Sequence, residues 1–117
     1  MSSHRFSVIR RSEARLDASA IRGVHELVAQ FPGARWCEGS KWRIESPREG
    51  TVEVSVSAGR VSLENHGSTN LVMSLFVQFQ RIIADVIFEE TVTGTWHDRD
   101  SLSEWVHVDE DGFAIAS

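Results

Sequence analysis

The sequence predicts an α+β fold in which two helices pack on one face of a mainly antiparallel sheet of about five strands. Residues 34–64 are built from short segments in which apolar and polar residues alternate, as expected for neighbouring strands with one buried face. Two longer segments, 18–31 and 68–88, carry their apolar residues at the spacing of a helix. A chain of 117 residues, 41% of them hydrophobic, is large enough for one domain with its own core.

The N-terminal part predicts one strand and one helix. Apolar residues occupy both faces of residues 5–10, which suits a strand of the sheet. In residues 18–31 apolar side chains recur every three or four positions, and Asp17 stands where an N-cap is expected. Pro32 and Gly33 end this helix. One of its faces is expected to cover the sheet while the other stays in water.

The central part predicts a run of antiparallel strands. Residues 34–38 and 41–46 can pair as a hairpin about Gly39. Residues 41–46, 51–57 and 60–64 then form a three-stranded meander, because each alternates inward apolar with outward polar residues. One face of this meander is expected to be exposed to solvent.

The segment 68–88 is the most apolar of the chain. Wound as one helix, it would be apolar over roughly 260° of its circumference, so it needs cover from more than a sheet. A second helix, the C-terminal segment or another subunit could supply that cover. Residues 90–96 predict a further strand, and 101–106 predict a short helix that begins with a capping box.

This order of elements is similar to the βαββαβ order of a ferredoxin-like domain, with the hairpin at 34–46 as an addition. The comparison rests on element order alone, and a fold does not assign a function.

Composition and charge bound the class of protein. No signal-peptide core and no uncharged run of membrane-spanning length is present, and Cys37 is the one cysteine. We therefore expect a single cytoplasmic domain over residues 1–117, with no membrane contact. The net charge of −5 divides into +4 over residues 1–48, −2 over 49–88 and −7 over 89–117. Residues 109–117 would form a flexible acidic tail, and a basic partner could dock on the acidic side.

The densest polar segment predicts a binding surface. It follows a predicted strand, where loops often carry function, and its candidate residues are Trp96, His97, Asp98, Asp100, Glu104 and Trp105. A simpler interpretation is a polar turn in which Asp98 or Asp100 caps the next helix. The histidine spacing fits no metal site, so neither a metal nor a cofactor is predicted.

Other candidates are weaker. The N-terminus of the helix at 68–88 could bind an anion through His66, Ser68 and Thr69, although Ser68 and Thr69 also serve as caps. Nucleic acid is not expected as a partner of this acidic chain, since its small basic region contains no binding motif. That region consists of Arg10, Arg11, Arg15 and Arg35.

The apolar helix, the four tryptophans and the separated charge favour a non-catalytic interaction protein. It would form a homodimer or dock to another protein, which it could inhibit. The alternative is a small-molecule-binding or cofactor-independent enzyme domain, with a pocket between sheet and helices. In that case His97, Asp98 or His66 would supply the polar groups of the pocket.

Overall fold

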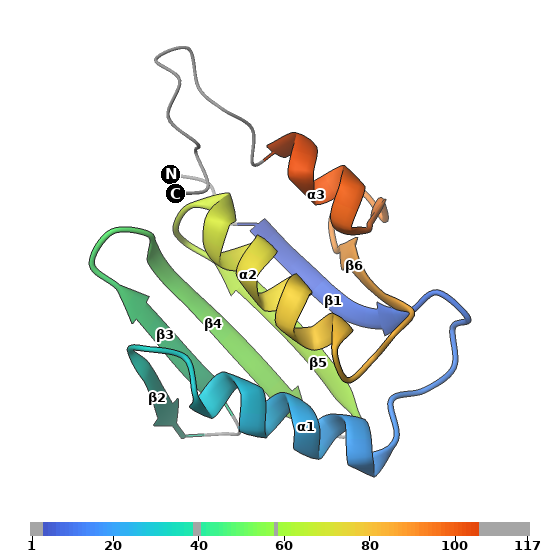
Figure 1. The fold of residues 1–117 in the computed structure, drawn as a ribbon, viewed down its shortest axis with the longest axis horizontal. Helices are drawn as coiled ribbons and strands as arrows, with labels where there is room; N and C mark the ends of the chain where they lie inside the picture. The colour runs from blue at the N-terminus through green and yellow to red at the C-terminus, as the bar shows by residue number, and fades with distance from the viewer. Residues whose placement is uncertain (1–3, 39–40, 58, 106–117) are drawn as a thin grey trace.

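The computed structural model describes residues 4–38, 41–57 and 59–105 as one curved sheet with helices against it (Figure 1). The predicted acidic tail lies outside these residues. The elements, in chain order, are β1 (His4–Arg10), α1 (Ala18–Ala29), β2 (Ala34–Cys37), β3 (Lys41–Ser46), β4 (Gly50–Ser57), β5 (Arg60–Asn65), α2 (Thr69–Gln80), β6 (Val86–Glu90), β7 (Trp96–His97) and α3 (Arg99–Trp105).

The predicted fold class is wrong. In place of about five strands and two helices in ferredoxin-like order, the described residues form a seven-stranded antiparallel sheet with three short helices. The strand order is β2-β3-β4-β5-β1-β6-β7. The hairpin β2–β3 is not an addition beside the sheet, because β3 pairs along its whole length with β4. At the other edge, β7 pairs with β6 and provides a seventh strand.

The long helix predicted over 68–88 is also wrong, since α2 ends at Gln80. The next residues turn, and β6 then pairs with β1 through Val8 and Phe88. Burial between β1 and the helices therefore overrides the helical spacing of this apolar run. The apolar residues of 68–88 are thus divided between a helix and a strand. Their number therefore requires no second subunit to cover them.

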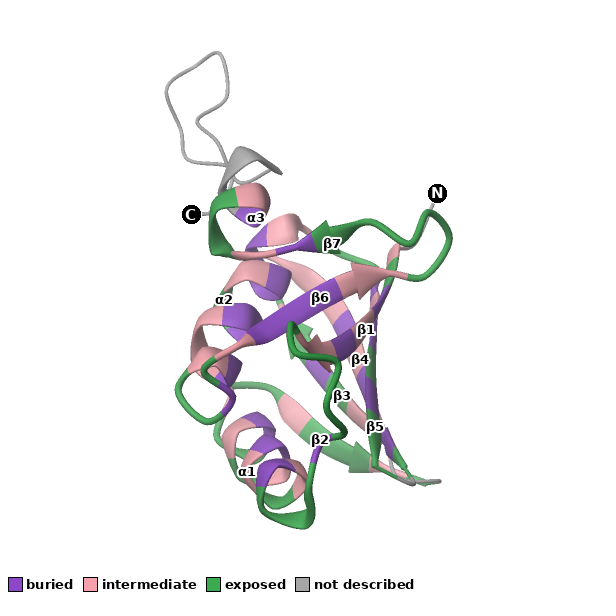
Figure 2. Ribbon diagram, turned by 90° about the vertical axis from the view of Figure 1, so that its right-hand side faces the viewer, coloured by how far each residue is buried: buried purple, intermediate pink, exposed green. Residues whose placement is uncertain are grey.

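The three helices lie on one side of the sheet, and α2 contacts both α1 and α3 (Figure 2). The core fills the space between them and the sheet. Its largest fully buried side chains include Phe6, Phe76, Phe79 and Phe88, and Leu102 of α3 closes the core at the β7 end. None of the helices in the described ranges is long and apolar enough to span a membrane.

Several local predictions are confirmed. Asp17 caps α1 by accepting a 2.8 Å hydrogen bond from the amide of Ala20. The meander forms as predicted, with β3, β4 and β5 in sequence.

The strand predicted over 90–96 is wrong, because the chain turns in the middle of this segment, where Gly94 has φ 73°. That conformation suits glycine and reverses the chain between β6 and β7.

Asp85 ties the end of β1 to the start of β6. Its carboxylate accepts a hydrogen bond from Ser12 Oγ at 3.0 Å and lies 3.3 Å from the guanidinium of Arg10. Partial burial raises the pKa of Asp85, but the hydrogen bonds from Ser12 and the charge of Arg10 outweigh it. The pKa of Asp85 is therefore lowered from its ordinary value near 3.8.

This junction predicts a pH dependence of stability. Because the folded pKa lies below the unfolded one, ionised Asp85 stabilises the fold above about pH 4, and this stabilisation is lost as the pH falls through the folded pKa. Urea unfolding of the protein and of Asp85→Asn should differ at neutral pH and converge in acid. In a protein that also carries Ser12→Ala, the stability difference that Asp85→Asn makes at neutral pH should be smaller. If the stability of the parent protein and that of Asp85→Asn fell by the same amount as the pH is lowered, this role of Asp85 would be contradicted.

Candidate functional site

The face of the sheet opposite the helices is the candidate site, and we call it the open face. Side chains alternate along each strand, so the polar members of the predicted meander point to this face. The strand register aligns them in rows across the sheet. One row reads, from β2 to β1, Arg35, Arg43, Glu53, Glu64 and Arg5.

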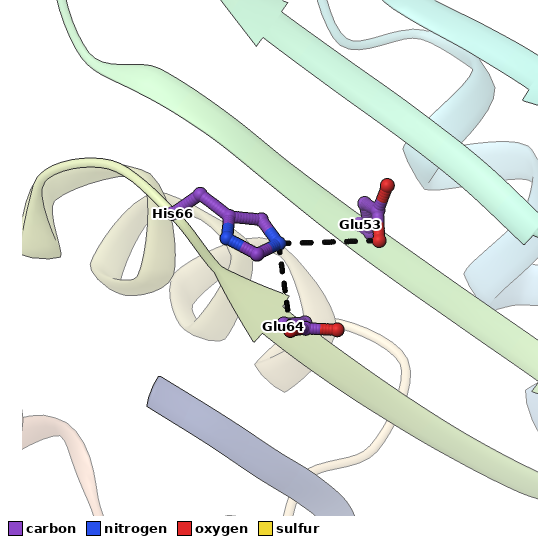
Figure 3. Close-up of side chains that lie close together, drawn as sticks. All are labelled: Glu53, Glu64 and His66. Carbon is purple, nitrogen blue, oxygen red and sulfur yellow. Dashed lines mark ion pairs between the residues drawn. The ribbon is translucent and has the colours of Figure 1, made fainter. Parts of the chain in front are cut away.

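A histidine and two glutamates of this face converge (Figure 3). Glu53 of β4 lies directly opposite Glu64 of β5, and His66 follows two residues after Glu64 on the same face. His66 Nε2 is 3.6 Å from Glu64 Oε2 and 4.0 Å from Glu53 Oε1. We call these three residues the Glu–His cluster. Their side chains are partly exposed, at 22%, 27% and 41% for Glu53, Glu64 and His66.

Two cations flank the Glu–His cluster. Lys41 Nζ is 3.7 Å from Glu53 Oε1, and Arg5 is 3.6 Å from Glu64 Oε2. These separations are longer than those of charge-assisted hydrogen bonds, and the Arg5 side chain is 65% exposed. Such surface pairs are worth about 0–1 kcal/mol each. The repulsion between the opposed carboxylates is thus offset by cations that can swing away at low cost.

Beside the cluster the open face is hollowed, with a volume of about 600 Å³. Serines of three neighbouring strands, Ser7, Ser55 and Ser62, line it together with Arg15, Arg60 and Trp96. Neither Arg15 nor Arg60 forms an ion pair within the part of the chain that the structure describes. The carboxylates of Glu13 and Glu89 also line it, so the hollow offers hydroxyl groups, both signs of charge and one indole to a polar molecule or to a partner's surface.

The residues of the predicted polar segment do not converge. Trp96 lies on the open face, where its Nε1 donates to Glu89 Oε2 at 3.0 Å. His97, the next residue of β7, is buried on the helix side, because neighbouring residues of a strand point in opposite directions. Asp98 caps α3 by accepting from the amide of Ser101, and it pairs with Arg11 at 3.4 Å. Asp100 is an exposed residue of the first turn of α3.

Glu104 and Trp105 belong to the end of α3, and their side chains are outside those described. The capping interpretation is thus confirmed for Asp98. The binding role of the segment stays a prediction.

His97 connects three elements. Its Nδ1 lies 2.7 Å from Ser101 Oγ, its Nε2 lies 3.6 Å from Glu90 Oε1, and its ring meets Phe6 edge-on. With 5% of its surface exposed, the imidazole has little access to a substrate. These contacts hold β7 and α3 on the rest of the fold.

The predicted anion site has an internal carboxylate close by. Glu49 Oε2 accepts hydrogen bonds from Ser68 Oγ and Asn70 Nδ2 at the start of α2, while Thr69 is the first residue of the helix. An external anion at these groups would have to displace the Glu49 carboxylate. His66 lies with Glu53 and Glu64 instead.

The tryptophans and arginines are also dispersed. Trp36 and Trp42 lie at the β2 edge, with the Trp42 Nε1 group donating to His25 Nδ1 at 3.0 Å, whereas Trp96 is at the β7 edge. Arg10 and Arg11 pair with Asp85 and Asp98, far along the sheet order from Arg35 of β2.

Two members of the Glu–His cluster, Glu53 and Glu64, were not predicted as site residues. The signal was present, because Glu64 and His66 have the i, i+2 spacing of two ligands on one strand. Glu53 alternates with valines on the preceding strand. Only the register of β4 against β5 places Glu53 directly opposite Glu64.

Neither a protein-family model, nor a curated protein, nor a solved structure matches this chain.

Proposed function

We propose that the chain is a non-catalytic interaction domain that docks through its open face. The observation that carries this proposal is the position of the helices, all of which lie on the other side of the sheet within the described residues (Figure 2). The open face is polar and carries both signs of charge, as many non-obligate interfaces do. Its serine side chains lose little conformational entropy when a partner covers them.

The charge order of the open face favours a second copy of the chain as the partner. From β2 to β5 the row carries two arginines and then two glutamates. A second copy facing it with the row reversed would place its Glu53 against Arg43 and its Glu64 against Arg35. An isologous interface needs this kind of self-complementary patch.

We expect a concentration-dependent dimer, with twice the 13.1 kDa mass of one chain, in light scattering on a sizing column. Added salt should weaken it, because the pairing charges are exposed. The variant Arg35→Glu/Arg43→Glu and the variant Glu53→Lys/Glu64→Lys should each be monomeric, since each carries one sign of charge over the part of the row from β2 to β5. Mixed together, they should form a one-to-one dimer.

The control is a charge change on the helix side, Arg22→Glu, which should leave the dimer intact. A parent protein that stays monomeric at every concentration would remove the second copy as the partner. A dimer that survives in both charge variants would place the contact elsewhere.

A second candidate function is the binding, in the hollow, of a small polar molecule that carries an anionic group. Arg15 and Arg60, which form no ion pair with other described residues, favour it. This hollow is on the open face and not between sheet and helices, where the alternative predicted from the sequence would have its pocket.

A further inference from the structure

We infer that the Glu–His cluster binds a divalent transition-metal ion of the zinc type. Glu53, Glu64 and His66 each offer one ligand atom, and these three atoms lie within 4.8 Å of one another. The inference goes beyond the proposed docking and does not depend on it.

The spacing of the ligand atoms is close to that of a tetrahedral site. Zinc bonds nitrogen and oxygen at about 2.0–2.2 Å, which separates neighbouring ligand atoms by about 3.4 Å. His66 Nε2 lies 3.6 Å from one carboxylate oxygen and 4.0 Å from the other. Small rotations of exposed side chains would therefore suffice to close the site. The backbone need not move, since both glutamates stand on paired central strands.

The ligand types select the metal. One imidazole with two carboxylates suits zinc, cobalt or manganese, whereas calcium prefers six to eight oxygen ligands. Of the described helices, none covers the open face, so a fourth coordination position would be open to water or to a ligand (Figure 2).

The charge arrangement supplies an independent reason. Glu53 and Glu64 face each other directly across β4 and β5, and like charges in that position repel. A divalent cation between the two carboxylates would attract both of them and so offset their mutual repulsion. Arg5 and Lys41 now partly supply that positive charge, at 3.6 and 3.7 Å from the same two oxygens that the metal would bind. They therefore compete with the metal.

The test is calorimetric titration of the full chain, without an affinity tag, with zinc chloride at neutral pH. We expect one saturable site per chain. Glu53→Gln, Glu64→Gln and His66→Ala should each weaken it by about tenfold or more, as loss of a ligand requires. Glu45→Gln is the matched control, because Glu45 lies on the same face and pairs with Arg35 outside the cluster.

A gain of affinity separates metal binding from damage to the fold. The variant Arg5→Ala/Lys41→Ala keeps all three ligands and removes both competing cations, so it should bind zinc several times more tightly. Cobalt bound to the parent protein should show the strong visible absorption of four-coordinate geometry, and His66→Ala should lose it. Absence of saturable binding, or equal affinity in the parent and the three ligand variants, would overturn the inference.

Discussion

Replacement of Phe79 by aspartate is expected to unfold the protein. Phe79 of α2 is fully buried and packs edge-on to Phe88 of β6, with 6.0 Å between the ring centroids. The change removes a large apolar side chain from between helix and sheet and leaves a charge without a partner there. Its cost of several kcal/mol is comparable to the whole stability of a domain, about 5–15 kcal/mol. Circular dichroism should show no cooperative urea transition.

The control for Phe79→Asp is Ser74→Asp. It places the same charge on the same helix at an exposed position, so urea unfolding should change little. A folded Phe79→Asp protein with an altered mass in light scattering would mean that this side of α2 is a subunit interface.

Gly67→Ala should destabilise the protein although Gly67 needs no unusual backbone conformation. A Cβ atom at Gly67 would lie 2.1 Å from the carbonyl oxygen of Glu49 and 2.9 Å from Cα of Gly50. Both obstacles are backbone atoms, so the loop before β4 and the loop before α2 would have to separate. The hydrogen bond from the Ser68 amide to the Glu49 carbonyl is 2.7 Å long, which shows how closely the two loops meet. This bond and the start of α2 would be disturbed. We expect a loss of about 3 kcal/mol in urea unfolding.

Gly94→Ala separates a steric clash from backbone strain. Gly94 has φ 73°, but no atom lies within 4 Å of an added Cβ. Its substitution should therefore cost only about 1 kcal/mol, the penalty for a left-handed alanine. Equal losses in Gly67→Ala and Gly94→Ala would contradict the close approach of the two loops.

The sequence was sufficient where the information is local. Alternation of valines with polar residues places Val52, Val54 and Glu53 on their correct faces, and Asp17 and Asp98 are recognisable as caps because a cap acts within three residues. It failed at Val86–Glu90, where a helical spacing of apolar residues conceals a strand. The candidate site is likewise only partly predictable from the sequence. The spacing of Glu64 and His66 can be recognised locally, but Glu53 is eleven residues from Glu64.

By itself, the sequence determined the strands of the meander, the positions at which the two main helices begin, and the solvent exposure of one sheet face. These features depend on side-chain periodicity and on caps, which are short-range properties. The tertiary structure alone decided that β1 lies between β5 and β6, that the sheet has seven strands, and that Glu53, Glu64 and His66 meet. The reason is that strand register and the burial of both faces of a segment are set by pairing between distant residues, and no local pattern records that pairing.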